Sequence, residues 1–399
     1  MKYAIIIPDG AADVPLDDLK GQTPLQAAYT PNMDAVVAEG HIGTTRNIPD
    51  SLSPGSDVAI ESLLGYDPRQ VYTGRAPIEA AARNVPVGDD DWVFRCNLVT
   101  IIDGRMEDHS AGHISTEEAA AMLEQLAAGL NIPGAAFYPG VGYRHLLVLG
   151  GQYKVTTTPP HQILGQKAAD HLPSGRGSKV LREIIARSGE LFAGSEINAV
   201  RRELGENPAT SVWLWGQGQK PQLASFATKY GLKRGAAITA VDLVRGLARL
   251  IGWDTIAVEG ATAWLDTNYA GKGAAAVEAI SHYDIVLVHV EAPDEAAHAG
   301  NVAGKVKAIE AIDRHVVGPI LQRLKAEGEG NWRILVLPDH ATPCTTRDHT
   351  REPVPFAMAG AGVKRVVTEK AFSESVAAAS DLHIRRGSDL MEYFLTVRS

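Results

Sequence analysis

Residues 2–10 read KYAIIIPDG, in which residues 3–7 form an unbroken apolar run of strand length that stops at Pro8-Asp9. A fully apolar strand suits the interior of a parallel sheet that is covered on both faces. Similar runs occur at residues 284–290 and 333–337, and they are followed by the pairs Pro293-Asp294 and Pro338-Asp339. Proline ends a strand because it has no N–H to donate. Each aspartate is therefore expected near the carboxyl end of a strand, the edge where open α/β sheets bind ligands.

Helical patterns separate these strands. Residues 116–129 combine an initial Thr, early Glu residues and a final Gly, and residues 240–251 and 302–325 have apolar residues at 3.6-residue spacing. This alternation predicts an α/β fold with a central, mostly parallel sheet flanked by helices.

The composition is that of a soluble globular protein. The chain has 399 residues, enough for two or three domains, and its 45% apolar and 21% charged residues exclude collagen-like, coiled-coil and disordered classes. The net charge of −9 disfavours nucleic acid and anionic membranes as partners. Two cysteines exclude a disulfide scaffold and favour the cytoplasm. The first apolar run is too short for a signal peptide, and no run approaches the length of a membrane helix.

Three aspartates and three histidines lie at strand ends or just after them: Asp9, Asp294, Asp339, His298, His340 and His349. On a helix, Asp294 and His298 would share one face and could bind one ion. Taken singly, such residues are more often caps or solvated side chains. Together they offer oxygen and nitrogen ligands without thiolate, which suits Mn²⁺, Zn²⁺, Co²⁺ or Mg²⁺. Six ligands suit two ions about 4 Å apart, which can clamp a phosphoryl group during an in-line displacement.

Ser56 is the candidate nucleophile. Residues 53–65 read SPGSDVAIESLLG, in which Pro54-Gly55 predicts a turn and residues 57–64 predict a helix. Ser56 would then lie at the helix N-terminus, where free N–H groups and the helix dipole favour a phosphate. A metal ion could hold its hydroxyl as an alkoxide. The alternative is an ordinary N-cap serine.

These motifs resemble those of the cofactor-independent phosphoglycerate mutases, and most closely the archaeal-type branch, in the alkaline phosphatase superfamily. The site motifs are Asp9-Gly10, PGSD at 54–57, Asp294-x-x-x-His298, PDH at 338–340 and His349-Thr350 with PVPF at 353–356. The resemblance runs from residue 1 to the final helix. It includes LGYDP at 64–68, YTGRAP at 72–77, SAGHI at 110–114, YRH at 143–145, WLWGQG at 213–218 and LDTNY at 265–269.

The resemblance implies an alkaline-phosphatase-like core and the interconversion of 3-phosphoglycerate and 2-phosphoglycerate, a reaction of glycolysis and gluconeogenesis, through a phosphoserine intermediate. It also implies two divalent ions, with Mn²⁺ the expected metal, and no 2,3-bisphosphoglycerate. By the family pattern, one ion is held by Asp9, Ser56, Asp339 and His340, and the other by Asp294, His298 and His349.

A discontinuous domain is expected because Asp9 and Ser56 lie near the start of the chain and the other ligands lie in residues 294–349. The resemblance implies that residues 1–90 and 228–399 form this metal-binding, phosphotransfer domain. Residues 91–227 would form an inserted, smaller α/β (α+β) cap domain that binds substrate and covers the site. The two domains are expected to move relative to one another.

The inserted domain should supply cations for a small substrate with a phosphate and a carboxylate, because arginine binds both groups in bidentate fashion. The candidate arginines, each with a surface salt bridge as the ordinary alternative, are Arg95, Arg144, Arg201 and Arg202. His109 resembles a substrate-domain histidine of the wider family, and Asp108 is a candidate proton shuttle. Lys272 is a candidate for reaching the phosphate.

Other functions predict different features. Bacterial proteins similar to these mutases are proposed to phosphorylate homoserine, and the motifs do not separate the two activities, although no nucleotide fingerprint G-x-x-x-x-G-K-[ST] occurs. Ser56 lacks the x-Pro-x-Arg that follows a sulfatase nucleophile. A metal-stabilised structural protein would leave the six ligands and Ser56 unexplained.

Overall fold

The computed structural model of the chain describes residues 1–130, 132–365 and 371–397. The chain forms two compact units. Unit 1 comprises Met1–Tyr72 and Gln222–Ser399, and unit 2 comprises Thr73–Pro221. Unit 1 is therefore built from both ends of the chain, and unit 2 is a continuous insertion.

Unit 1 contains an eight-stranded sheet with the order β11-β10-β12-β1-β13-β14-β2-β15. In that order the strands span Asp254–Ile256, Gly235–Ile238, Ile285–Val290, Lys2–Pro8, Trp332–Val336, Val354–Gly360, Gly40–Thr45 and His383–Ile384. The described strands pair in parallel, except that β14 runs antiparallel to β13 and β2. The sheet is thus mostly parallel, as predicted.

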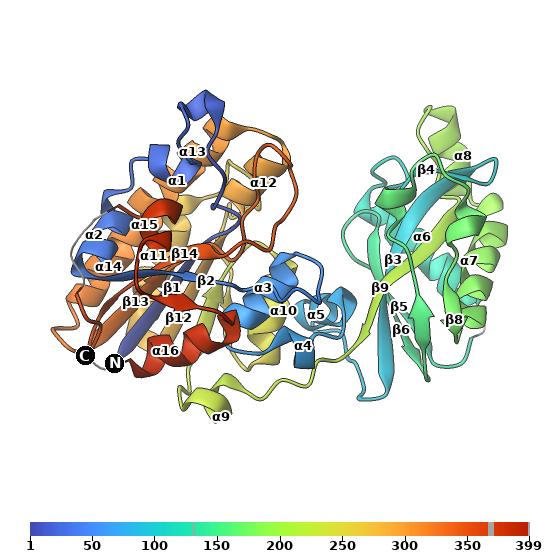
Figure 1. Ribbon diagram of the computed structural model, residues 1–399. Helices are drawn as coiled ribbons and strands as arrows, with labels where there is room; N and C mark the ends of the chain where they lie inside the picture. The colour runs from blue at the N-terminus through green and yellow to red at the C-terminus, as the bar shows by residue number, and fades with distance from the viewer. Residues whose placement is uncertain (131, 366–370, 398–399) are drawn as a thin grey trace. The chain divides into compact units, whose positions relative to one another are not determined.

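The helices of unit 1 cover both faces of this sheet (Figure 1). They are α1 (Pro24–Ala27), α2 (Pro31–Glu39), α3 (Ser56–Leu63), α4 (Pro68–Val71), α9 (Phe226–Tyr230), α10 (Asp242–Leu250), α11 (Tyr269–His282), α12 (Ala292–His298), α13 (Val302–Ile312), α14 (Gly318–Lys325), α15 (Glu374–Ala378) and α16 (Leu390–Thr396).

Two-sided cover explains why the central strands are apolar throughout. On one face, Ile6 of β1 and Val288 of β12 pack in a core with helices α2, α11, α13 and α14. On the other face, the ring of Tyr3 meets that of Phe394 in α16, with centroids 5.7 Å apart. Successive side chains of a strand point to opposite faces of the sheet, so each central strand packs against both helix layers. Each fully buried aliphatic side chain contributes about 1.5–3 kcal/mol to the stability of the fold.

The three predicted strands are present as β1, β12 and β13, and β1 pairs in parallel with both of the others. The pair Pro8-Asp9 and the pairs after β12 and β13 therefore lie at one edge of the sheet, as expected for parallel strands. The predicted helix at 302–325 is interrupted by a π-helical segment, Asp313–Val317. Pro319 follows it and has no N–H to continue the regular hydrogen-bond pattern.

Unit 2 contains a five-stranded antiparallel sheet, in which β3 pairs with β4, β6 and β9, and β6 pairs with β5. These strands are β3 (Asp91–Ile102), β4 (Arg105–Asp108), β5 (Ala135–Tyr138), β6 (Arg144–Gly150) and β9 (Ser211–Gln219). A separate hairpin joins β7 (Lys154–Thr156) and β8 (Ser174–Arg176). The helices are α5 (Arg75–Ala82), α6 (Thr116–Gly129), α7 (Ser178–Ala193) and α8 (Glu196–Glu203).

The unit boundaries differ from the predicted domain boundaries. Residues 73–90 belong to unit 2, because α5 packs on β3 and β9, and residues 222–227 belong to unit 1, because Phe226 packs on Trp253 with ring centroids 4.7 Å apart. Neither junction carries a compositional signal, so the boundaries could not be read from the sequence.

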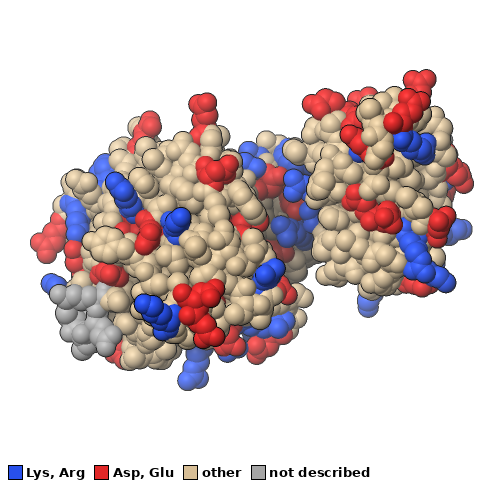
Figure 2. Space-filling view, turned by 90° about the horizontal axis from the view of Figure 1, so that it is seen from above, with Lys and Arg blue, Asp and Glu red and all other residues tan. Residues whose placement is uncertain are grey.

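Within the described residues, no helix is long and apolar enough to cross a membrane. Acidic and basic side chains are scattered among other residues over the visible face (Figure 2).

Candidate active site

The structure brings the seven predicted metal-site residues of unit 1 to the carboxyl edge of its sheet. Asp9 follows β1, and Asp339 and His340 follow β13. Asp294 and His298 lie on α12, the helix after β12. Ser56 is the first residue of α3, and His349 lies in the loop that leads to β14.

The first group consists of Asp294, His298 and His349. The Nε2 atoms of His298 and His349 lie 3.1 and 3.5 Å from Oδ2 of Asp294 and 2.9 Å from one another. Nδ1 of His298 lies 2.9 Å from the carbonyl oxygen of Arg347 and must donate to it, which leaves Nε2 free to bind an ion. Two nitrogens and one oxygen therefore converge on one point.

The second group consists of Asp9, Asp339 and His340, with Ser56 beside it. Nε2 of His340 lies 3.0 Å from Oγ of Ser56, 3.5 Å from Oδ1 of Asp9 and 3.4 Å from Oδ2 of Asp339. The Thr342 hydroxyl donates to Oδ1 of Asp294, so its oxygen accepts a hydrogen bond from Nδ1 of His340. The Nε2 lone pair of His340 then faces the same space as the two carboxylate oxygens.

The residues present fit divalent cations. Oδ1 of Asp9 and Oδ2 of Asp339 are buried and have no hydrogen-bond partner among the described residues. The other oxygen of Asp339 accepts from the N–H groups of Gly10 and His340. Carboxylates with one oxygen fixed and one turned to a histidine nitrogen are typical metal ligands, because a cation supplies the missing partner.

Electrostatics indicate the same need for positive charge. Burial and the neighbouring carboxylates of Asp339 and Asp294 raise the pKa of Asp9 well above its usual range. Burial also acts to raise the pKa of Asp294, but hydrogen bonds with His298 and His349 hold it well below that range. The hydrogen bond to Asp294 raises the pKa of His298 to about 9. Buried carboxylates this close are costly without a compensating charge.

Ser56 is not an ordinary N-cap. Gly55 is the N-cap of α3, and no side chain there caps the helix. The Ser56 hydroxyl instead meets Nε2 of His340, at a helix N-terminus that favours a phosphate.

Gly10 lets the two groups approach one another. Its φ of +58° is in the left-handed region, and a Cβ there would collide with Oδ1 of Asp294 and Oγ1 of Thr342.

We expect Gly10→Ala to weaken Mn²⁺ binding more than about tenfold, since it must displace a carboxylate ligand by a substantial part of an ångström. The matched control is Gly21→Ala, at φ +81° with no heavy atom within 4 Å of the added Cβ. That variant should lose only about 1–2 kcal/mol of stability to backbone strain. Metal titration and thermal unfolding of both variants check this, and equal Mn²⁺ affinities would contradict it.

Unit 2 contains a group of basic side chains, here called the cationic set: Arg75, Arg95, Arg144, His109 and His161. Arg95, Arg144 and His109 were predicted from the sequence to bind substrate. Arg95 pairs with Glu79 at 3.1 Å and stacks over the ring of Trp215 at 4.1 Å. The charges of Arg75 and Arg144 lie close enough to lower the pKa of Arg95, although burial is the larger cause. Arg144 itself is exposed.

Two histidines complete this set. The rings of His109 and His161 are 6.2 Å apart, and they contact Tyr143 and Trp215 respectively. Burial lowers the pKa of His161, and the nearby charges of His109, Arg95 and Arg75 lower it further. Arg75 and His161 were not among the residues predicted from the sequence. Arg75 lies in a family motif, but His161 follows two prolines and carries no pattern of its own.

Arg201 and Asp108 do not have the predicted surroundings. The Arg201 guanidinium is buried, pairs with Glu118 and Glu206 at 3.0 Å each, and donates to backbone carbonyls. The Asp108 carboxylate accepts from the N–H groups of Ser110 and Gly112 and from two side chains. Burial acts to raise its pKa, but these hydrogen bonds lower it to about 2. Both residues are thus engaged in holding loops, and a proton shuttle needs a pKa nearer neutrality.

Arg202 and Lys272 have different surroundings. Arg202 is exposed in the last turn of α8. Lys272 is fully buried in unit 1, where its Nζ donates to the carbonyl oxygen of His289 at 3.4 Å. Burial lowers the pKa of Lys272 to about 8, while Glu291 acts to raise it.

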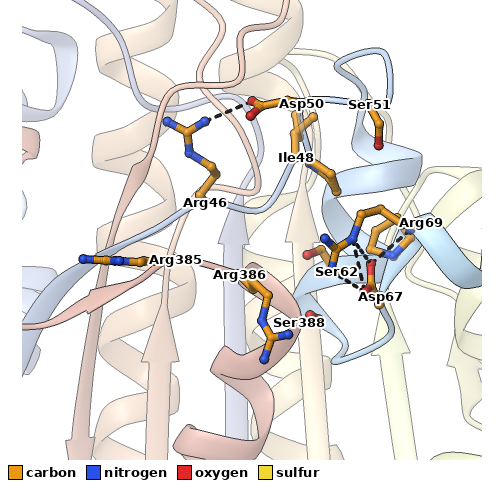
Figure 3. Close-up of a pocket in the computed structure, with 13 residues that line it drawn as sticks. Arg46, Ile48, Asp50, Ser51, Ser62, Asp67, Arg69, Arg385, Arg386 and Ser388 are labelled. Atoms are coloured by element: carbon orange, nitrogen blue, oxygen red, sulfur yellow. Dashed lines mark hydrogen bonds and ion pairs between the residues drawn. The ribbon is translucent and has the colours of Figure 1, made fainter.

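Unit 1 also has a cavity of about 420 Å³ whose lining includes Arg46, Arg69, Arg385 and Arg386 (Figure 3). Arg46 pairs with Asp50 at 3.1 Å and Arg69 with Asp67 at 2.6 Å, as the dashed lines show. Arg386 pairs with Asp389 at 2.9 Å. Local carboxylates thus balance three of these arginines, and none of the seven metal-site residues lines this cavity.

Comparisons with known proteins give one family. A family model described as 2,3-bisphosphoglycerate-independent phosphoglycerate mutase matches residues 37–198. The chain is 48% identical over 395 residues to a protein of that name from Methanothrix thermoacetophila, which covers 99% of this chain and 100% of the relative. It is 47% identical to a probable 2,3-bisphosphoglycerate-independent phosphoglycerate mutase from Geobacter sulfurreducens, with 99% and 100% covered.

Two solved structures are similar over the whole chain. The PH0037 protein from Pyrococcus horikoshii has a TM-score of 0.83 at 30% identity, with 99% of this chain and 96% of that chain covered. The cofactor-independent phosphoglycerate mutase from Thermoplasma acidophilum has a TM-score of 0.69 at 27% identity, with 99% of each chain covered.

The mostly parallel sheet, covered by helices and with polar groups at its carboxyl edge, defines a protein of the α/β class. Within this class, the chain belongs to the family of 2,3-bisphosphoglycerate-independent phosphoglycerate mutases, which are isomerases. The resemblance stated from the sequence and the predicted fold class are thereby confirmed.

Proposed function

We propose that this enzyme interconverts 3-phosphoglycerate and 2-phosphoglycerate through a phosphoserine at Ser56, with two divalent ions bound. The observation that supports this best is the convergence of Ser56 Oγ, two carboxylates and His340 beside a second group of ligands. Asp9, Asp339, His340 and Ser56 would hold one ion, and Asp294, His298 and His349 the other. Mn²⁺ suits these ligands, as do Mg²⁺, Co²⁺ and Zn²⁺.

In the first transfer, Ser56 loses its hydroxyl proton as its Oγ attacks the phosphorus in line with the bond to glycerate. That P–O bond breaks, its electron pair stays on the glycerate oxygen, and this oxygen takes up a proton. In the second transfer, the other glycerate hydroxyl attacks the phosphoserine and loses its proton, and the serine hydroxyl is restored. The bound ions would supply positive charge that favours the serine alkoxide and neutralises the phosphoryl oxygens.

We further propose that the cationic set of unit 2, with Arg75, Arg95, Arg144, His109 and His161, binds the anionic groups of phosphoglycerate. Arginine suits both a phosphate and a carboxylate. The glycerate must stay bound while it turns its second hydroxyl to the phosphoserine. Unit 2 would therefore carry the substrate-binding role and unit 1 the phosphotransfer role.

Arg144→Ala should raise the ratio of free phosphate released to phosphoglycerate isomerised, because glycerate lost after the first transfer leaves the phosphoserine to hydrolysis. Arg144 suits this test because it is exposed and stacks only loosely, 5.5 Å from the centroid of the Tyr143 ring. Free phosphate per turnover is the measurement, and Arg176→Ala, at an exposed position in β8, is the control. A ratio that stays at the wild-type value in Arg144→Ala would defeat this assignment.

Metal affinity should fall as pH is lowered below about 9. In the metal-free protein, the hydrogen bond to Asp294 raises the pKa of His298 to about 9, so this imidazole holds a proton at neutral pH. A divalent ion must displace that proton, which costs up to about tenfold in affinity per pH unit. Calorimetric titration of the metal-free enzyme with Mn²⁺ across this range is the check, and a flat profile would contradict the placement of His298 as a ligand.

An assay with 3-phosphoglycerate coupled to enolase tests the proposed reaction. An assay with homoserine and ATP tests the alternative, phosphorylation of homoserine. The names of the relatives favour the mutase. Phosphorylation of homoserine without mutase activity would overturn the proposal.

We also propose that the protein is cytoplasmic, because its two free, buried cysteines suit a reducing compartment.

A further inference from the structure

One buried histidine next to the metal-site residues was not anticipated from the sequence. His289 lies near the carboxyl end of β12, is only 1% exposed, and is not one of the seven expected ligands. Its Nε2 lies 2.9 Å from Oδ2 of Asp9, and its Nδ1 lies 3.2 Å from Oγ1 of Thr239. A chain of hydrogen bonds thus crosses three neighbouring strands, β10, β12 and β1.

The Asp9 carboxylate fixes the direction of this chain, because an ionised carboxylate can only accept hydrogen bonds. The proton of a neutral imidazole is then on Nε2, where it is donated to Oδ2 of Asp9. Nδ1 of His289 therefore accepts from the Thr239 hydroxyl, whose oxygen accepts the backbone N–H of Val241 at 3.1 Å. This leaves Oδ1 of Asp9 as the oxygen that faces Nε2 of His340, 3.5 Å away.

We propose that His289 is a positioning residue that presents Oδ1 of Asp9 to the ion of the second group. This rests on the proposed function, since that function places an ion there. The other two carboxylates are fixed in a comparable way, because Asp339 accepts two backbone N–H groups and Asp294 accepts the Thr342 hydroxyl. Asp9 differs because the group that orients it belongs to another strand and is itself oriented by a third.

His289 could instead coordinate an ion directly, since Asp9, His289 and Glu291 also form a group with ligand spacing. One observation favours the positioning role. The buried ammonium group of Lys272 donates to the carbonyl oxygen of His289 at 3.4 Å and lies close enough to interact with Glu291, so positive charge is already present at this group.

The test is calorimetric titration of the metal-free protein with Mn²⁺ alone, for the wild type, His289→Leu and His289→Gln. The glutamine amide can reach the position of Nε2 and donate to Asp9, but it is a poor ligand for Mn²⁺. We expect His289→Leu to weaken one of two binding events about 10- to 100-fold and to leave the other near the wild-type value. His289→Gln should recover most of that loss, and kcat should fall in His289→Leu while KM stays near the wild-type value.

Equal losses in His289→Leu and His289→Gln would show that His289 is itself a ligand and would overturn the proposal, as would wild-type binding by His289→Leu. If His289→Leu fails to fold, Thr239→Val and Thr239→Ser serve instead. Removing the hydroxyl should weaken the same binding event, and the serine should restore it; no difference between these two variants would overturn the proposal. The wild-type titration separately tests the proposed function, which requires two binding events.

Discussion

Ser56→Ala is expected to abolish phosphoryl transfer while the fold stays intact. The variant loses the Oγ that meets His340, and within the described residues no other hydroxyl lies at the N-terminus of α3 beside a ligand group. Losing a nucleophile of this kind lowers kcat by more than about 10³-fold. Ser56 is half-buried and caps no helix, so thermal unfolding should change little.

Metal content distinguishes loss of the nucleophile from loss of the site. Asp9, Asp339 and His340 remain in Ser56→Ala, so the bound metal should stay close to the wild-type amount. Mass spectrometry after incubation with phosphoglycerate should detect one added phosphoryl group in the wild type and none in the variant. The control is Ser53→Ala, three residues earlier at an exposed position of the same turn. Mutase activity near the wild-type level in Ser56→Ala would exclude the phosphoserine.

Removal of divalent metal is expected to abolish activity reversibly. Without ions, Oδ1 of Asp9 and Oδ2 of Asp339 are buried without a partner among the described residues, and Asp9 lies in the field of three other carboxylates. The enzyme should therefore lose activity after chelation and recover it when Mn²⁺ is added. Activity that persists after metal analysis shows none bound would reject a metal mechanism.

Bound metal should also stabilise the fold. An ion that binds only the folded state at about 100 times its Kd adds about 2.7 kcal/mol to the free energy of unfolding. The Tm should accordingly rise with Mn²⁺ concentration. Asp294→Asn removes a ligand charge from the first group, so its Tm should rise less steeply with Mn²⁺ than that of the wild type.

The sequence predicted the sheet of unit 1 and the strand ends near which its aspartates lie, for a local physical reason. An apolar run followed by Pro-Asp identifies both a buried parallel strand and its carboxyl end, so Asp9, Asp294 and Asp339 were placed before any contact was known. Asp294 and His298 were predicted to share a helix face, and both lie on α12. The sequence did not contain the unit boundaries, because α5 joins unit 2 through packing alone.

The candidate residues of unit 2 were harder to predict, because their roles depend on partners distant in the sequence. Arg201 had the residue type of a phosphate ligand, but Glu118, 83 residues away, and the nearby Glu206 occupy its guanidinium. His161 and His289 lie in no motif, and only tertiary packing brings them to His109 and Asp9. Residue type alone therefore could not separate the arginines and histidines that hold the fold from those available to a substrate.

The pairing of β1 has a consequence for how the protein is made. This strand is translated long before its two neighbours, because β12 and β13 begin at residues 285 and 332. At about 5–20 residues per second, roughly 15 to 60 s separate the synthesis of β1 from that of its first partner. Unit 2, which is continuous, can complete its fold on the ribosome during that interval. The apolar segment of β1 must meanwhile be shielded from self-association, and Asp9 can meet Asp339 and His340 only after residue 340 has been synthesised.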